Sequence, residues 1–160
     1  MRKVILLILS LFVTVSCITK TVTIGQARIV ADNYFSHYTE KDNLVLANSF
    51  SVQYNGINVY HVFNYIGGGF MVVAADDAVV PVLAQSNEGF IDMNKINPSA
   101  QYWFESYSKE IWQIITAEPD NTETLEQWKR IRNNEFYRSV TGTGPLLTTN
   151  WDQVEWYNYY

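Results

Sequence analysis

The sequence predicts an α+β fold in which a small antiparallel β-sheet, connected as a meander, has two to three helices packed on it. Apolar residues recur at helical spacing near residue 30 and again after residue 97, while residues 50–85 alternate with a period of two or run continuously apolar. Turn signals separate the strand-like segments by only a few residues, and such short connections favour antiparallel neighbours. The only cysteine of the 160 residues is Cys17, so we expect core burial to stabilise the fold without disulfides.

The first helix is predicted over residues 24–38. Thr23 and Gln26 have the spacing of a capping box, in which each side chain hydrogen-bonds the backbone N–H of the other residue. The apolar residues that follow recur at helical spacing: Ile24, Ala27, Val30, Ala31, Tyr34, Phe35 and Tyr38. His37 lies in the last turn, where a cation favours the helix dipole, so we expect a capping or surface role for it.

Four strands are predicted next, over residues 50–54, 58–66, 70–75 and 79–85, separated by Asn55-Gly56, by the three glycines 67–69 and by Asp76-Asp77. The third segment is nearly all apolar, which indicates a central strand covered on both faces. Pro81 in the fourth segment indicates an edge strand or a bulge. We expect His61 to be a half-buried structural residue and the two aspartates to form a solvated turn.

A second helix begins at Asn97-Pro98, where asparagine is a favoured N-cap and proline a favoured first helical residue. We expect one apolar face of this helix to lie across the sheet, marked by Ala100, Trp103, Tyr107, Ile111 and Ile114 and widened by Phe104 and Ile115. A short third helix is predicted from Thr122, Leu125, Trp128 and Ile131, with Lys129, Arg130 and Arg132 pointing outward.

Two patterns resemble ligand sites and lack their essential residues. The triple glycine is followed by no Gly-Lys-Ser/Thr, so it is not a phosphate-binding loop. Asp92 and Asn94 have the spacing of the first two ligands of a calcium loop, whose glycine and closing glutamate are absent. We therefore expect neither a metal site nor a cofactor.

Residues 1–17 read as a secretory signal: a basic start, an apolar run too short to span a membrane, and the small residues Ser16-Cys17. The signal also resembles a bacterial lipoprotein box with Cys17 as the lipidation candidate, and lipidation and simple cleavage both stay open. We expect an exported protein that is secreted, periplasmic or lipid-anchored at the bacterial envelope. Membrane contact is expected only through that lipid.

The charge of the chain is acidic. Removing residues 1–16 takes away two basic residues and no acid, so the net charge moves from −5 to −7. Nucleic-acid binding is not expected of such a chain, because it requires a basic surface.

Residues 59–83 (VYHVFNYIGGGFMVVAADDAVVPVL) resemble the pro-segment of streptopain-type cysteine proteases, which is also found as the Spi inhibitor domain. Residues 97–111 (NPSAQYWFESYSKEI) resemble the helix that follows it. Together with the tail, the resemblance covers about residues 24–160. It implies an inhibitor domain over 22–138, a linker over 139–144 with a processing site at Thr141, Gly142 and Gly144, and a truncated start of a papain-like catalytic domain over 145–160.

The tail (PLLTTNWDQVEWYNYY) carries Gln153, which resembles the oxyanion-hole glutamine of the family. The family's nucleophilic cysteine lies in a Gly-Cys-Val-Ala-Thr-like segment that this sequence does not contain, and neither does it contain the catalytic histidine segment. A glutamine amide can stabilise an oxyanion, whereas covalent catalysis requires a thiolate and its base. We therefore expect no peptidase activity from this chain alone.

The resemblance implies that the domain blocks the catalytic domain of a streptopain-like cysteine protease, in cis or in trans. It places the inhibitory loop over residues 92–97, with Asp92, Asn94 and Asn97 as the contact residues. Asn97 is also the expected helix cap, and the two roles compete for one side chain. Two alternatives stay open: the N-terminal fragment of a full protease zymogen, and an exported surface-binding lipoprotein.

Overall fold

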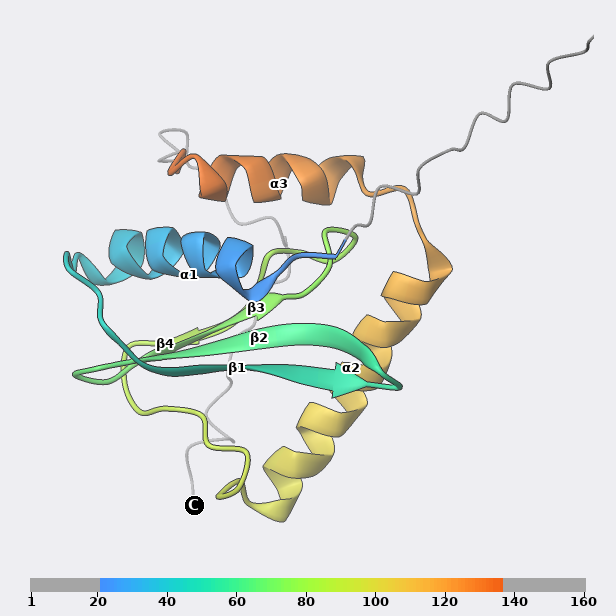
Figure 1. Cartoon of the computed structure of the whole chain (residues 1–160), viewed down its shortest axis with the longest axis horizontal. Helices are drawn as coiled ribbons and strands as arrows, with labels where there is room; N and C mark the ends of the chain where they lie inside the picture. The colour runs from blue at the N-terminus through green and yellow to red at the C-terminus, as the bar shows by residue number, and fades with distance from the viewer. Residues whose placement is uncertain (1–20, 137–160) are drawn as a thin grey trace, which may run out of the picture.

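The computed structural model describes residues 21–136, which form three helices and a four-stranded antiparallel sheet in the order β1-β2-β3-β4. Along the chain the elements are α1 (Ile24–Thr39), β1 (Leu46–Tyr54), β2 (Ile57–Tyr65), β3 (Phe70–Ala74), β4 (Val82–Ser86), α2 (Pro98–Ala117) and α3 (Thr122–Arg132). The predicted α+β class and its meander are confirmed (Figure 1).

Helices cover both faces of the sheet (Figure 1). α1 packs on β2, β3 and β4, and α3 packs on α1, so these two helices form successive layers over one face. α2 packs against β1 and β2 from the opposite face. The predicted capping box starts α1: Thr23 Oγ1 accepts from the Gln26 N–H at 3.3 Å, and the Thr23 N–H donates to Gln26 Oε1 at 2.9 Å.

β2 is buried on both faces because its side chains alternate between the two helix layers. Tyr65 stacks on Phe35 of α1 with the ring centroids 4.3 Å apart, whereas Tyr60 lies 6.4 Å from the Phe104 ring of α2. Odd-numbered residues of β2 thus face α1 and even-numbered residues face α2. This alternation directs the side chain of Asn64 to the α2 side of the sheet.

The first two strands differ slightly from their predicted bounds. β1 begins at Leu46 rather than at residue 50, and β2 runs one residue earlier than predicted. β3 is buried over residues 71–74, as expected of a central strand.

β4 starts at Val82, three residues later than predicted, because Asp76 holds the preceding residues in a turn. Its Oδ1 accepts from the Ala78 N–H at 2.9 Å, and its carbonyl accepts from the Val79 N–H at 3.3 Å. Asp76 is buried, so the expected solvated turn is wrong for this residue. Pro81 therefore precedes the edge strand β4 instead of lying inside it.

His61 is fully buried, with 1% of its surface exposed, rather than half-buried as predicted. Its Nε2 lies 2.9 Å from the Val22 carbonyl oxygen and its Nδ1 lies 2.8 Å from Ser51 Oγ. A carbonyl can only accept, so Nε2 carries the proton and the Ser51 hydroxyl donates to Nδ1. Burial lowers the pKa of His61 below its usual 6.5, which keeps the ring neutral.

α2 packs on the sheet with most of its predicted face. Tyr107, Ile111 and the flanking residues Phe104 and Ile115 pack against the core. Trp103 is 51% exposed and Ile114 is also exposed, so the prediction is wrong for these two residues. Ser108 lies on the packed face. Its Oγ donates to the Phe104 carbonyl at 2.7 Å and lies 3.3 Å from the Tyr60 hydroxyl oxygen, so a small side chain stands where the helix crosses β2.

α3 closes the α1 side of the domain, and the predicted third helix is confirmed. Trp128 is 1% exposed, and its Nε1–H donates to the Val79 carbonyl at 2.9 Å. Leu125 is exposed instead of packed. The three basic residues expected to point outward are exposed: Lys129, Arg130 and Arg132.

The end of α3 is bound to α1. The Asn33 side-chain amide donates to the carbonyls of Ile131 and Arg132 at 2.9 and 3.1 Å, in the last turn, where carbonyls lack their usual helical partners. His37 is exposed, as predicted, and its ring stacks on Phe136 at 4.1 Å.

Candidate functional site

The loop over residues 87–97 joins β4 to α2 and crosses the sheet to do so. β4 is an edge strand next to β3, whereas α2 packs on β1 and β2. The connection therefore runs beneath the sheet on the α2 side (Figure 1). We call this segment the crossing loop.

The triple glycine between β2 and β3 holds the start of the crossing loop. The Gly69 N–H donates to the Gly89 carbonyl at 2.8 Å. Gly69 has φ +104°, and a Cβ there would lie 2.5 Å from Cζ of Phe35. Only glycine fits this conformation beside that ring, so the turn serves as a backbone support for the loop.

Asn64 of β2 holds the crossing loop at Ile91, two residues after Gly89. Its Oδ1 accepts from the Ile91 N–H at 2.8 Å, and its Nδ2 donates to the Ile91 carbonyl at 2.9 Å. The second Nδ2 hydrogen is directed to Asn48 Oδ1, 2.7 Å away on β1. Asn64 is 1% exposed, and its two bonds to Ile91 are buried, where unpaired amides are unfavourable.

Between Ile91 and α2 the chain forms a short arch over residues 92–97. Asp92 Oδ1 accepts from the Asn94 N–H at 3.0 Å, and the Asp92 carbonyl accepts from the Lys95 N–H at 2.9 Å. Lys95 Nζ lies 3.5 Å from Asp92 Oδ2. Met93, Asn94 and Lys95 are exposed at the tip of the arch.

Asn97 closes the arch as the N-cap of α2. Its Oδ1 accepts from the Ala100 N–H at 2.9 Å, and Pro98 occupies the first turn, as predicted. Asn97 is exposed, and no hydrogen bond of its side-chain NH2 group to another described residue is present. The cap therefore uses the oxygen and leaves the nitrogen directed to solvent.

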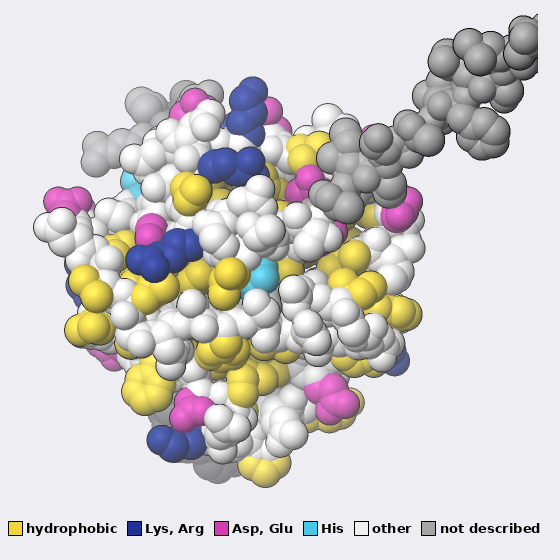
Figure 2. Space-filling model, viewed as in Figure 1, with side chains coloured by type: hydrophobic (Ala, Val, Ile, Leu, Met, Phe, Trp, Pro, Cys, Tyr) yellow, Lys and Arg dark blue, Asp and Glu magenta, His cyan; other side chains and the backbone are white. Residues whose placement is uncertain are grey.

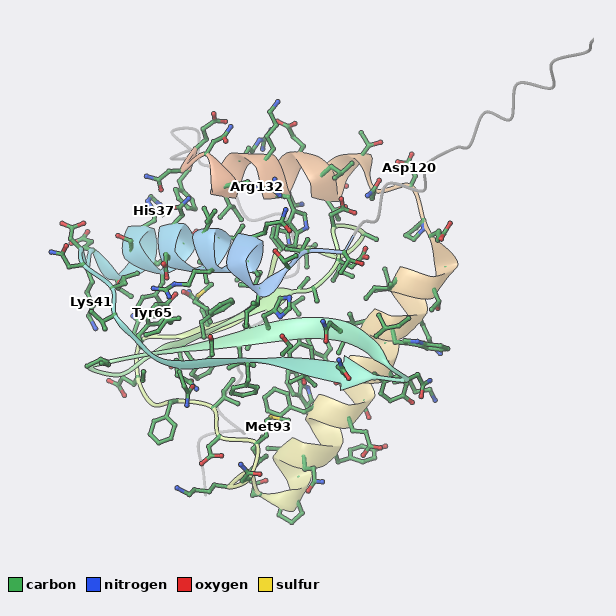
Figure 3. All side chains as sticks on the ribbon, viewed as in Figure 1. His37, Lys41, Tyr65, Met93, Asp120 and Arg132 are labelled. Carbon is green, nitrogen blue, oxygen red and sulfur yellow. The ribbon has the colours of Figure 1, made fainter. Side chains whose placement is uncertain are left out.

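Apolar side chains surround the arch. Tyr102 is 74% exposed, and Phe90, Met93 and Trp103 are exposed as well. Figure 2 shows hydrophobic side chains at the surface in the lower part of the view, where the crossing loop meets the start of α2. Figure 3 places Met93 on this side of the sheet, and His37 and Arg132 on the other.

Two shallow hollows flank Phe104. One has a volume of about 360 Å³ and is lined by Phe90, Ile91, Asp92, Lys95, Ile96, Asn97, Ala100 and Phe104. The other has a volume of about 370 Å³ and is lined by Val52, Gln53, Tyr54, Tyr60, Met93, Gln101, Phe104, Glu105 and Ser108. The arch thus stands between two apolar depressions that a partner surface could fill.

Phenol groups in this region stay neutral. Burial raises the pKa of Tyr60, and burial together with Glu110 raises the pKa of Tyr107. Within residues 21–136, no cluster of three or more histidine, cysteine or acidic residues could hold a metal ion. The arch thus offers a partner hydrogen bonds, apolar contact and the charged pair Asp92–Lys95.

Residues 19–111 match the Spi protease inhibitor family. The chain belongs to that family. The match covers the sheet, α1, the crossing loop and the first part of α2, and it ends before α3. No curated protein and no solved structure matches the chain. Membership in the Spi family indicates a protease-inhibitor function, with a protease as the partner.

The arch contains three of the residues selected from sequence. Asp92, Asn94 and Asn97 lie together in the arch. The other selected residues lie outside the described part of the chain: Cys17, Thr141, Gly142, Gly144 and Gln153. No helix within residues 21–136 is long and apolar enough to cross a membrane.

The sequence did not predict which residues support the crossing loop. Asn64 stands in an otherwise mostly apolar strand, and a buried amide must find partners. The sequence therefore indicates that Asn64 has hydrogen-bond partners, but it does not show that the partner is Ile91, 27 residues away.

Proposed function

We propose that this chain inhibits a streptopain-like cysteine protease by placing the arch over residues 92–97 in its active-site cleft. The observation that carries this proposal is the position of an exposed arch, fixed at both ends, within the segment matched to the Spi family. Asp92, Asn94 and Asn97 are its proposed contact residues.

A fixed arch suits an inhibitor because its backbone is already ordered before the protease binds. A mobile loop loses conformational freedom when it binds, and that loss weakens the affinity. Here hydrogen bonds at Gly89, Ile91 and Asn97 already define the path of the backbone. If the protease cuts the arch, these bonds hold both new ends in place and favour resealing over release.

The exposed aromatic residues beside the arch are the proposed affinity determinants. Tyrosine and tryptophan carry much of the binding energy at protein interfaces. Trp103 stacks on Tyr107 at 5.0 Å, which orients its ring before a partner arrives. The cleft rim of the protease would close on Tyr102 and Trp103 while the arch enters the cleft.

A second candidate function is that of a pro-segment acting in cis, favoured by the likeness of residues 145–160 to the start of a catalytic domain. A short linker gives an effective concentration of about 1 mM, so a dissociation constant of about 1 μM keeps roughly 99.9% of a tethered protease shut. An untethered inhibitor requires about nanomolar affinity for the same effect. Cleavage near residues 141–144 would then release the enzyme.

The proposed location is the bacterial envelope or its exterior. The support is the signal-like composition of residues 1–17, with Cys17 as the candidate lipid attachment site. Mass spectrometry of the mature N-terminus distinguishes a lipidated cysteine from a cleaved, unmodified end.

The proposal is tested by adding the purified chain to streptopain and measuring peptide hydrolysis. We expect hydrolysis to fall to near zero at a modest molar excess, while trypsin, which uses a serine nucleophile, keeps its full rate. Unchanged streptopain activity at a tenfold excess would contradict the proposal.

A further inference from the structure

We infer that Asn64 is a positioning residue for the inhibitory arch: its buried side chain presets the loop for the protease without touching the protease itself. This inference rests on the proposed function. It assigns a role to a β2 residue that lies outside residues 92–97.

The geometry at Asn64 resembles that of a paired strand residue. Its amide donates to and accepts from the same residue, Ile91, at 2.9 and 2.8 Å. Two parallel bonds of this kind fix both the position and the orientation of one peptide segment. They act on the residue immediately before the arch, so they set the direction in which Asp92 leaves the sheet.

Within the described residues, only Asn64 hydrogen-bonds the backbone of Ile91. No other hydrogen bond of the Ile91 backbone is present there. A leucine at position 64, between the cross-strand partners Asn48 and Phe70, would have a similar size but would leave the N–H and C=O of Ile91 unpaired. The loop would then move toward water to satisfy them.

Loss of this support should reduce the fraction of molecules whose arch has the binding-competent shape. The apparent affinity falls in proportion to that fraction. We expect Asn64→Leu to associate with streptopain at least about tenfold more slowly. Because a loosened arch fits a cleft as a substrate does, we also expect the protease to cut it between residues 91 and 97.

The experiment compares four forms of the chain: wild type, Asn64→Leu, Asn64→Ser and Val30→Ala. Serine is uncharged and too short to bond both the N–H and the C=O of Ile91, so Asn64→Ser provides a milder variant if Asn64→Leu does not fold. Val30 is buried on α1, on the opposite side of the sheet, and its truncation lowers stability without touching the loop. The measurements are the association rate with streptopain, the mass of the recovered inhibitor, and amide hydrogen exchange over residues 91–97 in the free chain.

The inference predicts slower association, cleavage within the arch and at least tenfold faster exchange of the arch amides for the Asn64 variants. Val30→Ala should show none of these at equal or lower stability. Wild-type association and wild-type exchange in a folded Asn64 variant would overturn the inference. If the wild type fails to inhibit, the proposed function fails, and hydrogen exchange alone still decides whether Asn64 sets the loop.

Discussion

Asn97 accepts the Ala100 N–H through its side-chain oxygen, so only its NH2 group is available to a partner. The two roles expected of this residue are therefore compatible in one conformation. Serine caps helices about as well as asparagine, but it has no amide nitrogen. Substitution by serine thus separates helix capping from protease contact.

We predict that Asn97→Ser leaves the free energy of unfolding within about 0.5 kcal/mol of wild type, because the cap is retained. Inhibition of streptopain should weaken about tenfold, the equivalent of roughly one hydrogen bond. Chemical denaturation and inhibition constants check the two effects. Asn97→Ala is the control that removes both functions. Unaltered inhibition by Asn97→Ser would assign the residue to capping alone.

His61 is the residue from which we expect a pH-dependent stability. The folded state holds its pKa below 6.5, whereas the ring titrates near 6.5 in the unfolded chain. Above that pH the ring is neutral in both states, so this group makes no pH-dependent contribution. As pH falls through 6.5 the unfolded chain binds the proton first, and stability decreases until the lower, folded-state pKa is passed.

The free energy of unfolding should therefore be level above about pH 7 and decline between about pH 6.5 and 5, before most carboxylates titrate. Denaturant titrations across this range measure it. His61→Gln should flatten the decline, whereas His37→Gln, at an exposed site, should keep it. A flat wild-type profile from pH 7 to 5 would show that His61 is not held neutral.

At the scale of elements, features that depend on local sequence signals were predicted, whereas features that depend on tertiary contacts were predicted less well. The Thr23–Gln26 capping box, the Asn55-Gly56 turn and the Asn97-Pro98 helix start each act within a few residues, and the structure contains all of them. On α2 the packed face includes Ser108, whose hydroxyl meets Tyr60, 48 residues away, whereas Trp103 and Ile114 are exposed. Periodicity does not show which edge of a broad apolar stripe is covered, so the prediction was wrong for those two residues.

α3 lies beyond the segment matched to the Spi family and nevertheless belongs to the core. Its Trp128 fills the space beside α1 and hydrogen-bonds the Val79 carbonyl. We expect Trp128→Ala to lower the free energy of unfolding by about 3–5 kcal/mol, since it removes a large buried side chain.

The matched control is Leu125→Ala on the same helix, where the exposed side chain should cost less than about 1 kcal/mol. Urea denaturation of both variants gives the comparison. A loss below about 1 kcal/mol for Trp128→Ala would mean that α3 is not part of the folding unit.

At the scale of the whole molecule, the sheet lies between the arch and the end of the described chain. The arch and the exposed aromatic residues lie on the α2 side, whereas α3 and the exit of the chain at Phe136 lie on the α1 side. A catalytic domain joined after residue 136 must therefore reach around the sheet to meet the arch. The sequence did not predict this arrangement, because the order of the layers depends on long-range packing.

The most direct test of the account is the rate at which iodoacetamide alkylates the catalytic thiol of streptopain with and without the chain bound. An arch lying in the cleft covers that thiol, so alkylation should slow in proportion to the bound fraction and recover when the complex dissociates. Full-rate alkylation of a protease shown to be bound would place the chain elsewhere on the enzyme and contradict active-site coverage.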